Sequence, residues 1–343
     1  MISFVNRLRQ LAAEDPQAVA VTCAGESITR SELLERGGDL AVHLQGLGVG
    51  FGDLVTNALP NSIDWFVTYV AVWMLGATPQ PVSSRLPQRE LEALIALADP
   101  PVVVGVADGI VTDRPTLPVG FRAPHVDASH LPDVISPAWK APTSGGSTGR
   151  PKLIVSGDPA SMDENAPPAL LMHKDGCLVM PGPLYHNGPA VWSWQALLAG
   201  MKVALMPRFD AEGTLAEIQQ HGGSVLYMVP TMMKRIWRLP EDTRNSYDLS
   251  SLRVVWHLAE PCPEWLKQCW IDWLGAERIF ELYAGTEAQT STVITGTEWL
   301  AHRGSVGRPA PGTVMVTDED GNELPTGEMG EVWMRTWATA RAT

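Results

Sequence analysis

Cysteine is scarce in this sequence, and its spacing offers no metal or redox motif. The chain has 343 residues and four cysteines, Cys23, Cys177, Cys262 and Cys269. No two of them form a C-x-x-C pair, and no histidine stands at zinc-finger spacing. Cys262 and Cys269 lie seven positions apart, a spacing that could place both on one face of a helix. We expect buried, reduced thiols, which is the usual behaviour of free cysteine.

Long apolar runs and blocks of positive charge are also missing. The most apolar window, residues 65–77, is too short to span a bilayer and is soon followed by Pro79 and Pro81. Residues 1–11 contain no apolar run of the signal-peptide type. The net charge of −13 argues against non-specific nucleic-acid binding and against an anionic membrane surface. The sequence therefore predicts a soluble, cytoplasmic protein without nucleic-acid partners or stable membrane insertion.

The chain is instead rich in apolar residues, arranged in an alternation of helices and strands. The hydrophobic content of 45% is ample for a large core, and the length suits two domains or one composite domain. Thr29 and Glu32 stand in capping-box register before an apolar pattern of helical spacing. Asn61 is a plausible N-cap for the next helix. Further helices are predicted at 87–98, near 190–199, at 211–222, up to Arg238 and from Pro263. Short apolar strands are predicted at 53–59, 78–82, 101–106, 177–182, 202–207, 224–230, 253–259 and 278–282.

This rhythm predicts an α/β fold. Alternating strands and helices are typical of largely parallel sheets covered by helices. Six prolines from Arg114 to Pro142, counting Pro142 itself, indicate an irregular crossover. From Gly304 onward the pattern changes to short β segments with turn signals. We therefore expect two βαβ-type lobes in residues 1–303, followed by the start of a β-barrel-like portion in residues 304–343.

A loop at residues 141–152, A-P-T-S-G-G-S-T-G-R-P-K, combines glycine, hydroxyl groups and cations. Its glycines let backbone N–H groups converge on one point, which forms an anion-binding concavity. This inventory suits a polyphosphate, and the alternative is a flexible Gly/Ser linker. It is not a Walker A loop, because Pro151 separates the last glycine from Lys152. The candidate phosphate-binding residues are Thr143, Ser144, Gly145, Gly146, Ser147, Thr148, Gly149 and Lys152.

Five further motifs follow in a fixed order: L-Y-H-N-G-P at 184–189, L-A-E-P-C-P at 258–263, E-L-Y-A-G-T-E at 281–287, G-S-V-G-R-P at 304–309 and G-E-M-G-E-V-W-M-R at 327–335. Together with the loop, they resemble the acyl-adenylate-forming (AMP-binding) superfamily, which includes acyl-CoA synthetases, luciferases and the adenylation domains of peptide synthetases. The resemblance covers most of the large N-terminal domain of that superfamily. Gly146 with Ser147, and Ala284, depart mildly from its usual pattern.

The resemblance implies roles for the residues of these motifs. Y-A-G-T-E directly follows a predicted strand, at the end where open α/β sheets bind ligands. By likeness, Tyr283 stacks on adenine, Thr286 donates to the α-phosphate and Glu287 binds Mg²⁺. Lys152, Thr286, Glu287 and His186 are the implied catalytic residues. Ala259, Glu260, Pro261, Ala284 and Gly285 complete the implied ATP-binding set.

An acyl pocket is implied next to the nucleotide site. His186 takes the position of a gate between the two pockets, and the other implied walls are Trp192, Val229, Ala259 and Ala284. Peptide-synthetase domains place an aspartate near this gate to pair with a substrate ammonium group, and this sequence has no carboxylate there. A buried cation without a partner is costly, so the acid is expected to be hydrophobic: aromatic, fatty or polycyclic. The motifs also resemble bile-acid-type CoA ligases, which makes a steroid or terpenoid acid one candidate.

The implied reaction is ATP-dependent acyl-CoA ligation with ATP, Mg²⁺ and CoA. In the superfamily a ribose-binding aspartate and a C-terminal lid with the adenylating lysine follow the β portion, and neither is found before Thr343. We therefore expect this chain alone to be weakly active or inactive. A nucleotide- or acyl-binding module without turnover and a luciferase-like enzyme are the alternatives, and a homodimer is left open.

Overall fold

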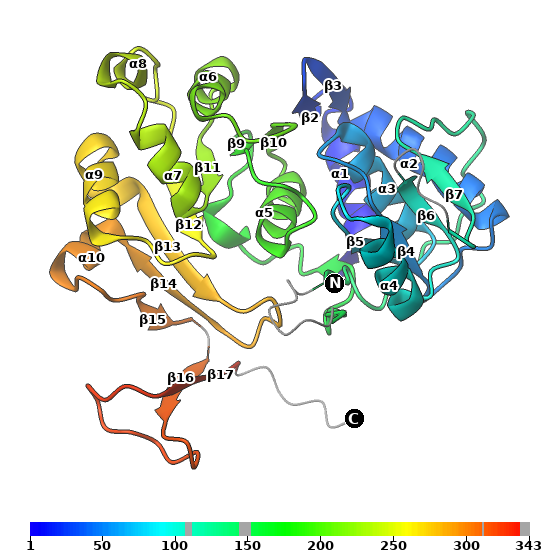
Figure 1. Ribbon diagram of the computed structural model, residues 1–343. Helices are drawn as coiled ribbons and strands as arrows, with labels where there is room; N and C mark the ends of the chain where they lie inside the picture. Colours follow the sequence, from blue (N-terminus) through cyan, green and yellow to red (C-terminus); the bar gives the residue numbers. More distant parts are fainter. Residues whose placement is uncertain (107–111, 144–151, 311, 337–343) are drawn as a thin grey trace. The chain divides into compact units, whose positions relative to one another are not determined.

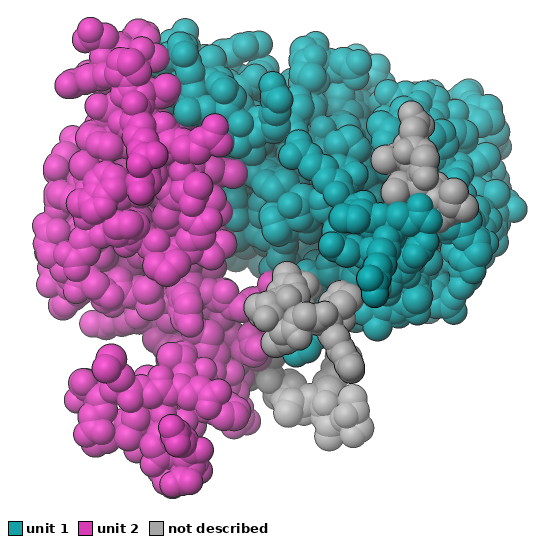
Figure 2. All heavy atoms as spheres, viewed as in Figure 1, with its two compact units in different colours: residues 1–227, 247–251 teal, residues 228–246, 252–343 magenta. Residues whose placement is uncertain are grey.

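The computed structural model describes residues 1–106, 112–143, 152–310 and 312–336. The chain forms two compact units, shown in different colours in Figure 2. Unit 1 comprises Met1–Tyr227 and Tyr247–Ser251, and unit 2 comprises Met228–Ser246 and Leu252–Thr343. The expected division at residue 303 is a different partition and stays a prediction.

Unit 1 contains a small parallel sheet with the strand order β5-β4-β6-β7. These strands are β4 (Leu54–Asn57), β5 (Thr78–Pro81), β6 (Val103–Val106) and β7 (Thr116–Pro118). Helices α3 (Ile63–Met74) and α4 (Gln88–Ala98) both contact β4. Strands β5 and β6 are buried along their length, and the V-V-G-V sequence of β6 is the continuous apolar run typical of a buried parallel strand.

A second group of strands in unit 1 runs in the order β11-β9-β10-β2-β3. Strands β2 (Val19–Cys23), β9 (Cys177–Met180), β10 (Lys202–Leu205) and β11 (Val225–Met228) are parallel, and β3 (Glu26–Thr29) pairs with β2 in a hairpin. Helices α5 (Asn187–Leu198) and α6 (Ala211–His221) contact β9. The remaining elements of this unit are α1 (Phe4–Glu14), α2 (Arg30–Gly46), η1 (Ala169–Leu171) and the short pair β1 (Ile2–Ser3) and β8 (Ser161–Met162).

Unit 2 carries its own strands in the order β15-β14-β13-β12. Strands β12 (Val254–Leu258) and β13 (Ile279–Ala284) are parallel, whereas β14 (Ser291–Thr295) and β15 (Arg308–Pro309) extend the sheet in antiparallel pairs. Helices of this unit are α7 (Pro230–Trp237), α8 (Glu241–Asn245), α9 (Glu264–Leu274), η2 (Ala276–Arg278) and α10 (Gly296–Ala301). A hairpin of β16 (Thr313–Thr317) and β17 (Glu331–Arg335) follows, visible in Figure 1. The predicted α/β class, with parallel strands and covering helices, is confirmed.

The core of unit 1 is built around an aromatic cluster on α3. Trp65 stacks on Tyr69 with ring centroids 4.1 Å apart, and Trp194 of α5 packs edge-to-face against Trp73 at 4.5 Å. All four side chains are almost fully buried. Each such pair adds about 0.5–1.5 kcal/mol beyond area burial, so the cluster fixes α5 against α3. No helix in the described ranges is long and apolar enough to cross a membrane.

Helix capping confirms one prediction and corrects another. Thr29 and Glu32 form the expected capping box at the start of α2. Helix α3, however, is capped by Ser62, whose hydroxyl accepts from Trp65 N, and not by Asn61. The Asn61 amide donates to Gly182 O and Met206 O, both at 2.9 Å. Asn61 is therefore used for a tertiary contact, because its side chain reaches the loops that follow β9 and β10.

Two smaller expectations also change. Cys262 lies before the first turn of α9, since Pro263 is the N-cap, so Cys262 and Cys269 do not share a helix face. Strand β13 continues through Tyr283 and Ala284, because both residues pair with β14. All four cysteines are free; Cys23 and Cys177 are buried, and the other two are half-buried.

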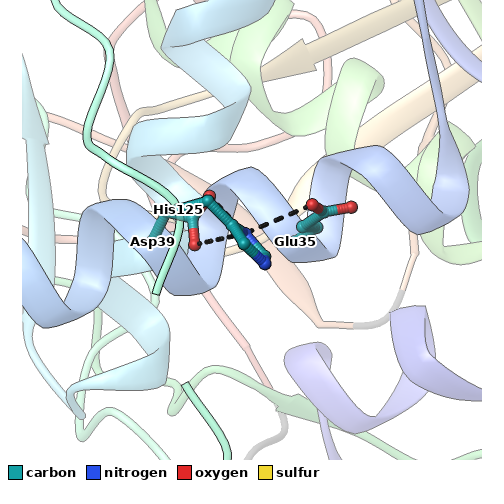
Figure 3. A group of neighbouring side chains, drawn as sticks. All are labelled: Glu35, Asp39 and His125. Atoms are coloured by element: carbon teal, nitrogen blue, oxygen red, sulfur yellow. Dashed lines mark hydrogen bonds and ion pairs between the residues drawn. The ribbon is translucent and has the colours of Figure 1, made fainter. Parts of the chain in front are cut away.

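The proline-rich crossover is irregular, as expected, apart from β7. It is attached to α2 through Asp39, whose Oδ1 accepts a hydrogen bond from Val126 N at 3.0 Å. His125 Nδ1 lies 3.2 Å from Asp39 and 3.3 Å from Glu35, one helical turn earlier (Figure 3). These contacts hold a segment without secondary structure against a helix.

Candidate functional site

The predicted phosphate loop is closed at its base. Thr143 and Leu153 form an antiparallel bridge, and Ile154 N donates to Pro142 O at 2.9 Å. This pairing brings Thr143 and the exposed Lys152 together at the two ends of the loop. Residues 144–151, which include the predicted Ser144, Gly145, Gly146, Ser147, Thr148 and Gly149, lie outside the described residues. The chain therefore enters and leaves the loop through one short ladder in unit 1.

His186 begins helix α5 in the same unit. It is the N-cap residue, but its side chain forms no capping hydrogen bond. The imidazole is exposed, with its ring 4.2 Å from that of Tyr185, and desolvation on its inner side lowers its pKa. A neutral imidazole at the start of a helix is free to contact a ligand.

Trp192 lies farther along α5 and is buried. Its ring packs edge-to-face against Tyr227 at 5.4 Å. Tyr227 also covers Gly188, where a Cβ would lie 2.4 Å from the tyrosine hydroxyl oxygen. Glycine is thus required at position 188 for the tyrosine to lie here. Unit 1 brings His186 and Trp192 of the predicted acyl pocket onto the same helix.

In unit 2, the A-E-P motif follows the C-terminal end of β12. Ala259 has a φ of +70°, a left-handed conformation that is strained for alanine and fixes the direction of the next residues. The Glu260 carboxylate accepts hydrogen bonds from Thr231 N at 3.0 Å and from the Thr231 hydroxyl at 2.7 Å. Val229, the N-cap of α7, offers no side-chain acceptor, so Glu260 caps this helix instead.

The Y-A-G-T-E motif lies at the end of the neighbouring strand. Because β12 and β13 are parallel, with Leu258 opposite Leu282, the A-E-P and Y-A-G-T-E motifs emerge at the same edge of the sheet. Tyr283 is 45% exposed, which leaves its ring open to a partner. This edge is where open α/β sheets bind ligands.

Glu287 lies in the turn after β13, and its carboxylate points back toward Gly285. A Cβ on Gly285 would lie 3.2 Å from Glu287 Oε2. Glu287 is exposed, and within the described part of the chain it forms no ion pair. An exposed carboxylate is a ligand of the kind that Mg²⁺ takes together with water and phosphate oxygens. The residue therefore fits the predicted magnesium role.

A buried ion pair lies behind these strand ends. Lys267 of α9 pairs with Glu281 of β13, and both side chains are buried. The Lys267 ammonium also lies 5.0 Å from the Trp299 ring. His257, opposite Glu281 on β12, is buried, and desolvation together with the Lys267 charge lowers its pKa to about 3. His257 is therefore neutral at physiological pH and adds no charge beside the ion pair. The Lys267–Glu281 pair joins α9 to β13.

Two other polar features of unit 1 lie outside the predicted site. A cavity of about 210 Å³ is lined by Arg36, Asp39, Asp64 and Arg122 among apolar side chains, and these charges cancel. The Glu35, Asp39 and His125 side chains of Figure 3 lie close enough to hold a metal ion. Hydrogen bonds and ion pairs already account for that grouping, and no predicted site residue belongs to either feature.

Comparison with known proteins places this geometry in a family. The AMP-binding enzyme family matches residues 8–342. The chain therefore belongs to the AMP-binding enzyme family.

Particular relatives are consistent with this assignment. The chain is 29% identical over 335 residues to a feruloyl-CoA synthase from Amycolatopsis sp, covering 94% of this chain and 67% of the relative. Its fold is similar to o-succinylbenzoate CoA synthetase from Bacillus subtilis, with a TM-score of 0.79, 18% identity and coverage of 95% and 68%. It is also similar to the N-terminal domain of FACL13 from Mycobacterium tuberculosis, with a TM-score of 0.74, 21% identity and coverage of 97% and 88%.

The predicted site residues thus fall into two groups, one in each unit. Thr143, Lys152, His186 and Trp192 belong to unit 1, whereas Val229, Ala259–Pro261 and Tyr283–Glu287 belong to unit 2. Sequence reasoning did not foresee the tertiary contacts of Asn61 and Glu281, and it did not single out Lys140, whose ammonium donates to the Asn187 side chain. No local pattern in the sequence marked these contacts, because each joins segments that are separate along the chain.

Proposed function

We propose that the protein is an ATP-dependent acyl-CoA ligase. A carboxylate oxygen of the acid attacks the α-phosphorus of ATP, the bond to pyrophosphate breaks, and an acyl adenylate forms. The thiol of CoA then attacks the acyl carbon, and AMP leaves. The family match over residues 8–342 carries this proposal, and the CoA-ligase relatives support it.

Each motif residue takes a proposed role in these steps. Lys152 and the 143–149 loop hold the β- and γ-phosphates through backbone N–H groups, hydroxyls and one cation. Tyr283 stacks on adenine beside Ala259, and Thr286 donates to the α-phosphate. Glu287 would hold Mg²⁺, which neutralises charge on the phosphates when it is bound.

The proposed acid is hydrophobic and aromatic. The relatives named for feruloyl-CoA and 2-succinylbenzoate act on aromatic acids by their names, and Trp192 with Tyr227 offers an aromatic wall in unit 1. Fatty and polycyclic acids, steroid acids among them, are the next candidates. No carboxylate stands beside His186 to pair with an amino-acid ammonium group.

An ATP–pyrophosphate exchange assay with a panel of acids tests the proposal. The panel holds substituted cinnamates and benzoates, fatty acids, a steroid acid and free amino acids, each with and without CoA. We expect exchange with an aromatic acid and thioester formation when CoA is added. Preference for a free amino acid would overturn the substrate class. Tight binding of an acyl-AMP analogue without exchange for any acid would favour a binding module.

A further inference from the structure

Lys140 is a buried lysine close to the predicted phosphate loop that the family motifs do not include. It lies three residues before Thr143, and only 7% of it is exposed. Its ammonium donates a hydrogen bond to the Asn187 side-chain oxygen and lies 4.6 Å from the Trp139 ring centroid. Asn187 directly follows His186. One side chain therefore connects the approach to the phosphate loop with the first turn of α5.

The backbone around Lys140 is held from both sides. Its carbonyl accepts a hydrogen bond from Ser156 N at 3.0 Å, and Ala141 N donates to Pro79 O at 2.9 Å. The Trp139 carbonyl accepts from Trp73 Nε1 at 3.0 Å. These bonds fix the Cα of Lys140 between β5 and the segment that leaves the phosphate loop. The direction of the side chain toward α5 is therefore set by the fold.

Within the described part of the chain, the Lys140 ammonium has no carboxylate as a counterion. Among the residues that the structure describes, no carboxylate lies within 4.0 Å of Lys140 Nζ. The acid with the largest effect on it is Asp158, which is exposed and forms no ion pair with it. Desolvation therefore dominates and lowers the pKa of Lys140 to about 8. Buried lysines are normally paired with an anion, and the described side chains supply Lys140 only with the neutral Asn187 oxygen.

The helix that Lys140 approaches adds positive potential. Helix α5 spans 12 residues, and the side chain of its N-cap residue, His186, forms no capping hydrogen bond. Unsatisfied N–H groups and the helix dipole make this end electropositive, so it favours anions and disfavours cations. Lys140 lies at the N-terminal end of α5, where a positive charge without an anion is unfavourable. A bound anion would compensate the lysine and the helix terminus together.

We propose that Lys140, together with the first turn of α5, binds an oxyanion of the reacting groups. That oxyanion is either the carboxylate of the acid or the α-phosphate of ATP, which become joined in the acyl adenylate. The inference rests on the proposed function and adds a second cation to a site in which Lys152 holds the terminal phosphates. The position beside His186, the proposed gate between the nucleotide and acyl pockets, supports this placement.

Kinetic analysis of Lys140→Met in the pyrophosphate-exchange assay tests the proposal. Methionine keeps most of the side-chain length and removes the charge. If Lys140 binds the carboxylate, KM for the acid rises about 10- to 100-fold while KM for ATP stays within twofold. If it binds the α-phosphate, KM for ATP rises and affinity for an acyl-AMP analogue falls by a similar factor. Unchanged values of all three constants overturn the proposal.

The control is Lys174→Met, which removes an exposed lysine paired with Glu14. It should leave every constant within twofold, and circular dichroism should confirm that both variants are folded. A fall in kcat with no change in either KM would also overturn the proposal, because it would place the contribution of Lys140 in the transition state and not in the binding of acid or ATP.

Competitive acetylation of the wild-type chain, read by mass spectrometry, follows Lys140 without turnover. A saturating concentration of ATP, of the acid or of the acyl-AMP analogue should slow the acetylation of Lys140 relative to that of Lys174. The slowing should be greatest for the ligand whose KM or affinity changes in Lys140→Met. Absence of exchange with any acid, combined with protection of Lys140 by ATP, would refute the proposed function and leave this inference standing. Activity without protection by any of the three ligands would refute the inference alone.

Discussion

Replacement of Lys140 by methionine should stabilise the folded protein at neutral pH. Burial lowers the pKa of this lysine from 10.5 to about 8, which corresponds to about 3 kcal/mol of unfavourable free energy for the charged form. Loss of the hydrogen bond to the Asn187 side-chain oxygen removes about 1 kcal/mol from the gain. We expect a net increase of about 2 kcal/mol in the free energy of unfolding at pH 7.

The stabilisation should depend on pH in a defined direction. The unfolded chain holds the lysine proton up to about pH 10.5, whereas the folded chain releases it near pH 8. The cost of the buried charge is fully present below pH 8 and is relieved as pH rises from 8 to 10.5. The advantage of the methionine variant should therefore shrink across this window. The pKa of the nearby His186 is lowered by desolvation, so this group does not titrate within the window.

Urea unfolding followed by tryptophan fluorescence, at pH 7 and pH 10, measures this effect. Lys174→Met is the matched control, because Lys174 is exposed and pairs with Glu14, and its effect should stay below about 1 kcal/mol at pH 7. A Lys140→Met variant less stable than wild type at pH 7 would show that the ammonium is compensated in the fold. An advantage of equal size at both pH values would refute the assignment to charge.

Further substitutions test other parts of the site and fold. Lys152→Ala should weaken ATP binding by about tenfold or more and leave an acyl-AMP analogue, which lacks pyrophosphate, nearly unaffected, as measured by calorimetry. Glu287→Gln should lower the affinity for ATP in the presence of Mg²⁺ and have little effect in EDTA. Lys267→Met should cost about 3–5 kcal/mol in urea unfolding because Glu281 stays buried without its partner, and adding Glu281→Leu should recover most of the loss. Gly307→Ala should lower Tm strongly, since a Cβ there would lie 2.0 Å from Val293 O at a φ of +96°.

Other outcomes would contradict these expectations. Equal losses for ATP and for the acyl-AMP analogue would remove Lys152 from the terminal phosphates. Normal Mg²⁺-dependent ATP binding by Glu287→Gln would make that residue structural. Additive losses from Lys267→Met and Glu281→Leu would show that their ion pair has no coupling energy. For Gly307→Ala, the control is Gly321→Ala, also at positive φ but with nothing near its Cβ, which should lose less.

Local patterns determined much of the fold. The capping box of Thr29 and Glu32 depends on residues three apart, so the sequence alone located the start of α2. The apolar runs that form β6 and β12 are buried along their length. Their apolar composition predicted buried strands. The order of the motifs likewise indicated the AMP-binding family, because a motif is a local pattern of residues.

Contacts between distant segments were decided only by the tertiary structure. Asn61 and Ser62 are both suitable N-caps by residue type. Ser62 caps α3, whereas the Asn61 amide donates hydrogen bonds to Gly182 O and Met206 O. Glu260, expected at the nucleotide, also caps a helix through Thr231, 29 positions away. These hydrogen-bond partners depend on which segments lie close together in the fold, and the spacing of residues along the chain does not predict this.

The same reason explains why Lys140 could not be identified from the sequence. The sequence around Lys140 is typical of a proline-rich surface segment. In such a segment a lysine is solvated, and its charge contributes little to stability or binding. Burial beside Asn187, 47 positions later, changes the pKa of the same side chain and places it at a helix terminus. The chemistry of a titratable group is set by solvation and nearby charge, and both arise only when the chain is folded.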